Sequence, residues 1–149
     1  MKGTILRNPW WRRASLVPAA ASVAVICYLA LKPSPSIQNV PLMPRALGRW
    51  FEQEDFFCNV SGFFVLTVVI HATFARWRRE AAGAVAWRAL GLAVLVAGLE
   101  IAQLWLPKRV FDRHDIAAGW LGVVLASAPW LIATFTMRRR APVPASAVD

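Results

Sequence analysis

The chain has 149 residues, room for a single domain, and 58% of them are hydrophobic while 17% are charged. Soluble domains average about half apolar and about a quarter charged residues, and eight tryptophans suit a protein with much of its surface at membrane interfaces. The formal charge of +9 would suit a nucleic-acid-binding protein, but the basic residues form short clusters between apolar runs instead of one basic face. Composition and charge therefore exclude that class and indicate a membrane protein.

Four apolar stretches predict four membrane-spanning helices, since one span needs about 20 residues. They cover residues 14–31, 55–75, 84–106 and 115–136. The first follows a basic segment, residues 1–13, that resembles the start of a signal peptide, but no cleavage site precedes a soluble domain, so we expect an uncleaved anchor. The tail at 137–149 is rich in proline and alanine and is expected to be disordered. The predicted fold is all-α, a bundle of four transmembrane helices.

Charged residues between the stretches predict the orientation of the bundle. With both termini inside, the cytoplasmic segments hold eleven Lys and Arg and two acidic residues, whereas the outer segments hold six Lys and Arg, and six acidic residues lie on the outer side or just within the membrane. Cytoplasmic segments of membrane proteins carry the excess of basic residues. We therefore predict a multi-pass protein of a bacterial cytoplasmic (inner) membrane, with both termini inside and its functional face outward.

Polar residues occur at the predicted outer ends of the second and third helices. Asp55 and Asn59 are four residues apart and Glu100 and Gln103 are three apart, so each pair shares one helix face. A carboxylate at the membrane centre costs about 2.5–3.5 kcal/mol and less near the interface. Glu100 is therefore expected to face a polar cavity or a partner; the alternative is that it extends to the surface and only marks the topology.

The loop before the fourth helix adds further charged residues at the same depth. It contains Lys108, Arg109, Asp112 and Arg113, and Asp115 opens the helix. An acidic residue just before a helix, with another three residues later, is typical of a helix start. Capping is therefore the favoured role for Asp112, whereas for Asp115 capping and catalysis both stay open. Together with the two helix ends, this loop predicts a polar pocket.

Polar residues nearer the predicted cytoplasmic side have simpler interpretations. His71 lies too far along the second helix to join the pocket and is expected to hydrogen-bond a neighbouring helix. Arg88 is expected to keep its guanidinium in water at the head-group level. Gly91 and Gly98 are seven residues apart and suggest a packing seam; the alternative is that glycine is simply common in membrane helices. The sequence has no zinc-type cluster, glycine-rich phosphate loop or serine elbow, so neither a metal nor a cofactor is expected.

The polar residues from the third helix onward resemble the signature of the VanZ-like family, which reads roughly E-x-x-Q, P-x-R, F-D, x-x-D and then a glycine. The matching residues are Glu100, Gln103, Pro107, Arg109, Phe111, Asp112, Asp115 and Gly122. Asp55 and Asn59, followed by Phe63 and Phe64, resemble an earlier element of the family, so the similarity covers about residues 55–126. The chain departs from the family at Gly119, where members often have asparagine.

The resemblance implies a compact bundle of four to five spans and a role in the cell envelope. The namesake of the family is associated with low-level resistance to the glycopeptide teicoplanin, and some comparisons link the family to membrane enzymes acting on phosphate-bearing lipid head groups. The first hypothesis is therefore a pocket that binds or processes such head groups or lipid-linked cell-wall precursors, as a phosphoesterase or transferase if it is an enzyme. Glu100 and Asp115 would be the catalytic acids or bases. The substrate-binding residues would be Arg109, for the phosphate, with Gln103, Asn59, Asp112 and Asp55.

Two other functions compete with this hypothesis. A non-catalytic envelope protein could confer glycopeptide tolerance by binding a lipid, the drug or a partner, and it would need Arg109 but no ionisable base. A small multidrug-type transporter would need an acidic residue near the membrane centre, and the sequence has none there. The partners expected are therefore membrane lipids and lipid-linked precursors, and no nucleic acid.

Overall fold

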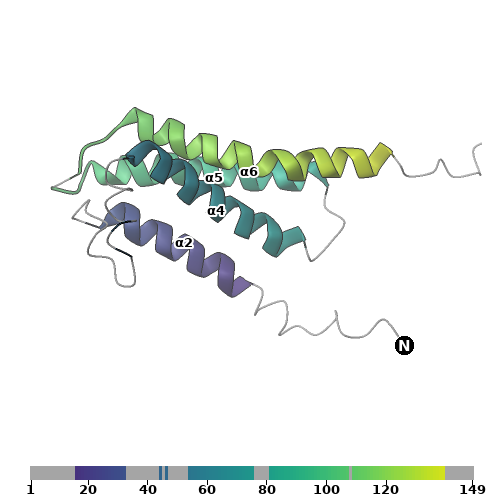
Figure 1. Cartoon of the computed structure of the whole chain (residues 1–149), viewed down its shortest axis with the longest axis horizontal. Helices are drawn as coiled ribbons and strands as arrows, with labels where there is room; N and C mark the ends of the chain where they lie inside the picture. The colour runs from purple at the N-terminus through teal and green to yellow at the C-terminus, as the bar shows by residue number, and fades with distance from the viewer. Residues whose placement is uncertain are drawn as a thin grey trace, which may run out of the picture.

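Four helices make up nearly all of the chain that the computed structural model describes, namely residues 16–32, 44, 46, 54–75, 81–107 and 109–139, with the backbone alone at 137–139. They are α2 (Leu16–Leu31), α4 (Asp55–Ala75), α5 (Ala82–Gln103) and α6 (Arg113–Arg139) (Figure 1). The predictions for the N-terminal segment 1–13, most of the first outer loop, Lys108 and the tail from residue 140 lie outside the described residues.

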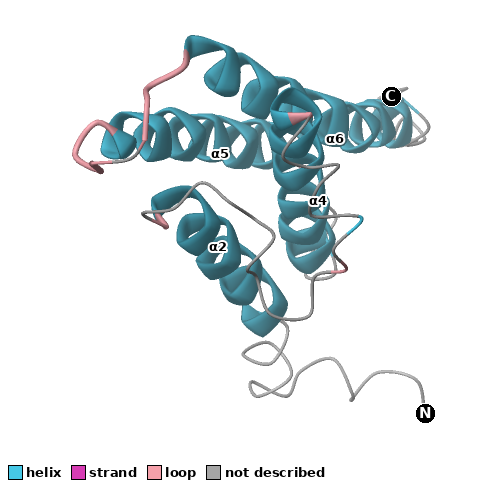
Figure 2. Ribbon diagram, turned by 60° about the vertical axis from the view of Figure 1, so that its left-hand side comes forward, coloured by secondary structure: helices cyan, strands magenta, loops and turns pink. Residues whose placement is uncertain are grey.

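The helices form a bundle in which α5 and α6 run side by side, while α4 and α2 are inclined to them (Figures 1 and 2). α4 and α5 pack against α6, and α2 lies on the other side, against α4 and α5 (Figures 1 and 2). The last turns of α2 and α5 and the first turns of α4 and α6 come together at the left-hand end in Figure 1. We call this the pocket end, and the opposite end the far end.

The helix bounds agree with the sequence prediction for α4 and differ by a few residues elsewhere. α5 ends at Gln103 instead of residue 106, because the chain then closes turns in which Leu104, Trp105 and Leu106 donate to carbonyls three residues back. Pro107 disfavours α-helical backbone in the residue before it. α6 begins at Arg113, two residues earlier than predicted.

Three of the helices are long and apolar enough to cross a membrane: α4, α5 and residues 113–136 of α6. Their outer surfaces carry large apolar side chains, including Trp87 (74% exposed) and Val124 (62% exposed), as expected for a lipid-facing bundle. α2 has 16 residues, or about 24 Å at about 1.5 Å per residue, which is shorter than the ~30 Å apolar layer. The protein is thus all-α with three candidate spans, and the first span stays a prediction.

Two glycines allow α4 and α6 to pack in direct contact. A Cβ atom at Gly122 would overlap the backbone carbonyl oxygen of Val60 and lie 2.9 Å from the backbone nitrogen of Phe64. A Cβ atom at Gly119 would lie 3.0 Å from Phe63 Cδ2 of α4 and 2.6 Å from Val96 Cγ1 of α5. Close approach through small residues is how helices associate within lipid. This contact brings the first turns of α4 and α6 together at the pocket end.

The predicted packing seam along Gly91 and Gly98 is wrong. Both residues are exposed on the outer face of α5, and a Cβ atom at either would meet nothing within 4 Å. Spacing alone places two residues on one face of a helix, but only the packing of the neighbouring helices decides whether that face is covered. Another face of α5 packs into the hydrophobic core, where Leu92, Val96 and Leu99 meet residues of α4 and α6. The core residues are Phe63, Leu66, Leu92, Val96, Leu99 and Val123.

Candidate functional site

A cavity of about 210 Å³ opens among the helices at the pocket end. One wall is apolar and is formed by α2, α4 and α5, with Phe63 and Leu99 from the core. The other wall is polar and comes from α4, α5, α6 and the loop before α6. Its residues are Asp55, Asn59, Glu100, Gln103, Arg109 and Asp115. The structure therefore brings together six of the seven candidate catalytic and substrate-binding residues that the sequence predicted. The function of these residues stays a prediction.

Helix geometry explains why these side chains meet. Asp55 and Asn59 lie in the first two turns of α4, and Glu100 and Gln103 lie in the last turn of α5. Residues three or four apart on a helix share a face, so each pair points in one direction. The first turn of α6 adds Asp115 from the third side.

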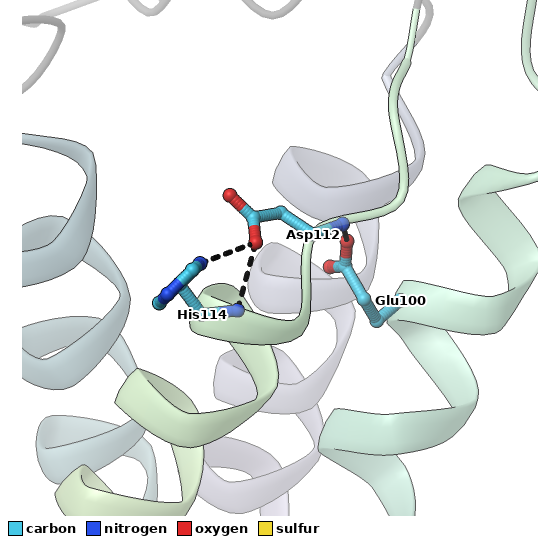
Figure 3. A network of polar contacts seen from close by, with 3 residues as sticks. All are labelled: Glu100, Asp112 and His114. Carbon is cyan, nitrogen blue, oxygen red and sulfur yellow. Dashed lines mark hydrogen bonds and ion pairs between the residues drawn. The ribbon is translucent and has the colours of Figure 1, made fainter.

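Glu100 is the most enclosed carboxylate of the cavity, with only 5% of the residue exposed. Its Oε1 atom accepts a hydrogen bond of 2.9 Å from the backbone N–H of Asp112 (Figure 3). The loop after α5 therefore folds back over the helix end and offers a backbone donor to the carboxylate. A buried carboxylate is costly without such donors.

Asp112 holds the start of α6 and does not line the cavity. Its Oδ1 atom accepts the backbone N–H of His114 at 2.8 Å and lies 2.9 Å from the imidazole Nδ1 of the same residue (Figure 3). Both hydrogen bonds from His114 favour the carboxylate form and lower the pKa of Asp112 from its ordinary value of 3.8. The predicted capping role is confirmed, and the contribution of Asp112 to the cavity is its backbone N–H.

Arg109 joins the loop to the end of α2. Its Nη2 atom donates to the carbonyl oxygen of Leu29 at 2.9 Å and its Nε atom donates to that of Lys32 at 3.3 Å. The last carbonyls of a helix lack intrahelical partners and attract cations, so the guanidinium stabilises the end of α2. These bonds use one edge of the guanidinium and leave the N–H groups of its outer edge for a ligand.

Asp115 faces Asn59 across the contact between α4 and α6. The Asn59 side-chain amide acts as a hydrogen-bond donor to the Asp115 carboxylate. The carboxylates of Asp55 and Asp112 are close enough to repel that of Asp115, and the guanidinium of Arg109 attracts it. Among residues 54–75, 81–107 and 109–136, however, no ion pair within 4.0 Å joins Arg109 to a carboxylate of the cavity.

Gln103 is 7% exposed and lines the cavity one turn beyond Glu100. Its side-chain amide makes no hydrogen bond to any residue that the structure describes, although no fully enclosed polar atom there lacks a partner. The amide therefore opens on the cavity, where it can both donate and accept a hydrogen bond.

A second polar group, the His71 cluster, lies toward the far end and consists of His71, Arg88 and Ser127. His71 is fully buried, and its Nε2 atom lies 3.0 Å from Ser127 Oγ, which confirms the predicted hydrogen bond between helices. Arg88 Nε donates to His71 Nδ1 at 3.3 Å, and Arg88 is half-buried, so the position of its guanidinium at the head-group level stays a prediction. Because arginine can only donate, Nδ1 accepts and Nε2 carries the proton donated to Ser127.

Several partners of the site could not be found in the sequence. The donor to Glu100 is a backbone N–H, and the acceptors of Arg109 are backbone carbonyls at the end of another helix. Backbone groups carry no residue-specific signal. Of the other basic residues of the loop, Arg113 is exposed and does not line the cavity, while Lys108 lies outside the described residues.

Comparisons with family models, curated proteins and solved structures return no match.

Proposed function

We propose that this chain is a VanZ-like membrane protein that binds the polar head group of a phospholipid or lipid-linked cell-wall precursor in the cavity at the pocket end. In this proposal the protein lies in a bacterial cytoplasmic membrane, α2 is a fourth span, both termini are inside, and the cavity faces outward. The excess of basic residues in the segments assigned to the cytoplasm supports this orientation.

The observation that carries the proposal is a cavity with six polar side chains at one end of a bundle whose outer surface is apolar. In a membrane the end of such a bundle lies at the level of the lipid head groups. The polar wall can bind a head group, and the apolar wall formed by α2 and α4 can contact the first carbons of the acyl chains.

The size of the cavity favours a head group over a larger ligand. Cavities for drug-sized molecules typically enclose about 300–1,000 Å³, whereas this one encloses about 210 Å³. It holds the volume of roughly seven water molecules at about 30 Å³ each. Direct binding of a whole glycopeptide antibiotic in this cavity is therefore disfavoured.

Each polar residue has a role in this proposal. Arg109 binds the phosphate through the outer edge of its guanidinium, since arginine pairs well with phosphate oxygens. Asn59 and Gln103 position the head group by hydrogen bonds. If the protein is an enzyme, Glu100 and Asp115 are the carboxylates able to take a proton from an attacking hydroxyl group or water.

The test is the lipid that the protein carries, measured by native mass spectrometry of the full chain purified in mild detergent. The wild type should retain a phosphate-bearing lipid, and Arg109→Lys, which keeps the charge but loses the planar fork, should retain several-fold less. Glu54→Gln is the matched control, since Glu54 is exposed just before α4 and does not line the cavity. Equal retention by wild type, Arg109→Lys and Asn59→Ala would contradict the proposal.

Catalysis is separated from binding by Glu100→Gln and Asp115→Asn in cells that lack the wild-type protein. An enzyme should accumulate its substrate in the lipid profile of both variants. A binding protein should leave the profile unchanged while the purified variants still bind lipid.

A further inference from the structure

We propose that the ligand of this cavity carries a primary ammonium group beside its phosphate, the chemistry of an ethanolamine-type phospholipid head group. This inference rests on the proposed head-group binding and names the class of ligand. It follows from three observations: the carboxylates that line the cavity, the lack of an ion pair between them and Arg109, and the Gln103 amide that opens on the cavity.

Among the lining residues that the structure describes, negative charges outnumber positive ones. Three carboxylates, those of Asp55, Glu100 and Asp115, line the cavity together with one guanidinium, that of Arg109. The carboxylate of Asp112 is close enough to repel those of Glu100 and Asp115. A ligand that brought only negative charge would meet this repulsion, so Arg109 alone is a poor site for a purely anionic head group.

Arg109 does not neutralise the carboxylates. Two of its N–H groups are directed to the carbonyls of Leu29 and Lys32, and no ion pair within 4.0 Å joins it to Glu100 or Asp115, all three being described residues. Its fixed place at the end of α2 keeps the positive charge on one side of the cavity. The carboxylates of α4, α5 and α6 lie on the other sides.

Two side chains that are more than nine-tenths buried present acceptors to the cavity. Glu100 is 5% exposed and has one backbone donor on Oε1. Gln103 is 7% exposed as a residue, and since no enclosed polar atom among the described residues lacks a partner, its unbonded amide opens on the cavity. An amide oxygen and a carboxylate that open on one cavity can both accept hydrogen bonds from a ligand with donors.

An ammonium group fits this set of acceptors better than other cations do. Its three N–H groups can be shared among the carboxylates and the Gln103 carbonyl oxygen. A trimethylammonium group has no N–H donor and is recognised by cages of aromatic rings, whereas Phe63 is the one aromatic residue among the described lining residues. No three His, Cys, Asp or Glu side chains among the described residues are placed to hold a metal ion.

A zwitterionic head group therefore matches both sides of the cavity. Its phosphate lies against Arg109 and its ammonium lies against Asp115, Glu100 and Asp55. The same chemistry occurs in the bilayer lipid and in the soluble compound glycerophosphoethanolamine, and the experiment distinguishes these two sources.

The experiment measures the apparent Kd of the full chain in detergent for phosphatidylethanolamine, phosphatidylcholine and phosphatidylglycerol with identical acyl chains. We expect phosphatidylethanolamine to bind about tenfold more tightly than the others, since a hydrogen bond between charged groups is worth about that factor. Asp115→Asn and Glu100→Gln should abolish the preference, and Glu54→Gln should leave it intact. If Glu100→Gln does not fold, Asp55→Asn at the exposed start of α4 tests the same charge.

The soluble compounds identify the source of the ligand. Glycerophosphoethanolamine should displace the bound lipid better than glycerophosphocholine does, and equal displacement would overturn the inference. If phosphatidylethanolamine binds more tightly than glycerophosphoethanolamine, the ligand comes from the bilayer. If the two bind equally, the ligand is the soluble compound. The ammonium group is part of the ligand in both cases.

Three outcomes separate this inference from the proposed function. Equal affinity for the three lipids, weakened equally by Arg109→Lys, would overturn the ammonium assignment and leave head-group binding in place. Binding of Mg²⁺ that is lost in Asp115→Asn, without any preference among lipids, would overturn it in favour of a metal ion. Lipid binding unaffected by any cavity variant would overturn the proposed function itself.

Discussion

The bundle has two groups of buried polar side chains, and they are satisfied in different ways. In the His71 cluster, His71 bonds both Arg88 and Ser127 and is fully buried. In the cavity, the Gln103 amide bonds to no described residue, and three carboxylates and one guanidinium are among the described lining residues. The first group is closed by the protein itself, while the second is open to a ligand.

This difference separates polar residues that hold helices together from those that face a ligand. Polar groups within a membrane are costly and are retained where they pair with one another or line a water-accessible cavity. The His71 cluster connects α4, α5 and α6 through side chains only, so removing a member should destabilise the bundle. Removing the Gln103 amide, which bonds to no described residue, should leave the stability of the bundle unchanged.

The largest effect is expected when the His71 cluster is broken at its centre. His71→Ala removes two hydrogen bonds and a buried ring next to Trp130, whose ring centroid lies 5.9 Å away. The free energy of unfolding should fall by about 2–4 kcal/mol, mostly from the cavity that is left. Unfolding of the purified protein by denaturing detergent measures this, and a loss no larger than that of an exposed substitution would show that the cluster is not structural.

The next largest effect is expected when Gly119 is replaced by asparagine. Gly119→Asn places a Cβ atom 2.6 Å from Val96 Cγ1 and 3.0 Å from Phe63 Cδ2, so the core must shift. Overpacking of this kind costs about 1–3 kcal/mol. The same unfolding assay applies, with Gly91→Asn on the open face of α5 as the control. A stable Gly119→Asn variant with improved lipid binding would instead show that the cavity can extend to this position.

A smaller loss is expected at the edge of the His71 cluster. Ser127→Ala removes the acceptor of the His71 Nε2–H and leaves no large cavity. Hydrogen bonds between membrane helices are worth about 0.6 kcal/mol on average and about 1.7 kcal/mol at most. In the double variant with His71→Ala, the loss from Ser127→Ala should largely disappear. Fully additive losses would exclude the bond as the cause.

At the cavity, removing a polar group should leave stability almost unchanged. Gln103→Leu replaces a buried amide without a described partner by an apolar side chain of similar size, so the free energy of unfolding should change by less than about 0.5 kcal/mol or rise. Binding of the head group should weaken in the same variant. A large loss of stability would show that Gln103 is held by the protein and not directed to a ligand.

The smallest effect is expected from the pH dependence of the α6 start. His114 lowers the pKa of Asp112 below 3.8, so the cap contributes stability above that pH and loses it as the pH falls below. Asparagine also caps helices but does not titrate. Acidification from pH 5 to pH 2 should therefore destabilise the wild type more than Asp112→Asn, as measured by thermal unfolding. Identical pH profiles would show that the cap is not coupled to protonation.

Residue type and spacing predicted a good part of the candidate site. Asp55 with Asn59, and Glu100 with Gln103, each lie on one helix face because the helix repeats every 3.6 residues, and all four line the cavity. The capping by Asp112 could also be predicted, since it depends on neighbours in the chain. The bond between Arg88 and His71 could not be predicted from the position of Arg88 near the helix end, because His71 lies on a neighbouring helix.

By itself the sequence determined three properties: that the protein is helical with an apolar outside, at which residues the helices occur, and which helix faces carry charge. These properties depend on composition and on short-range periodicity. Tertiary structure decided which faces meet. The contact at Gly122, the fold of the loop over Glu100 and the bonds of Arg109 to the end of α2 join residues far apart in the chain. Such contacts depend on how side chains of different helices fit together, and they turn a set of charged helix ends into one cavity.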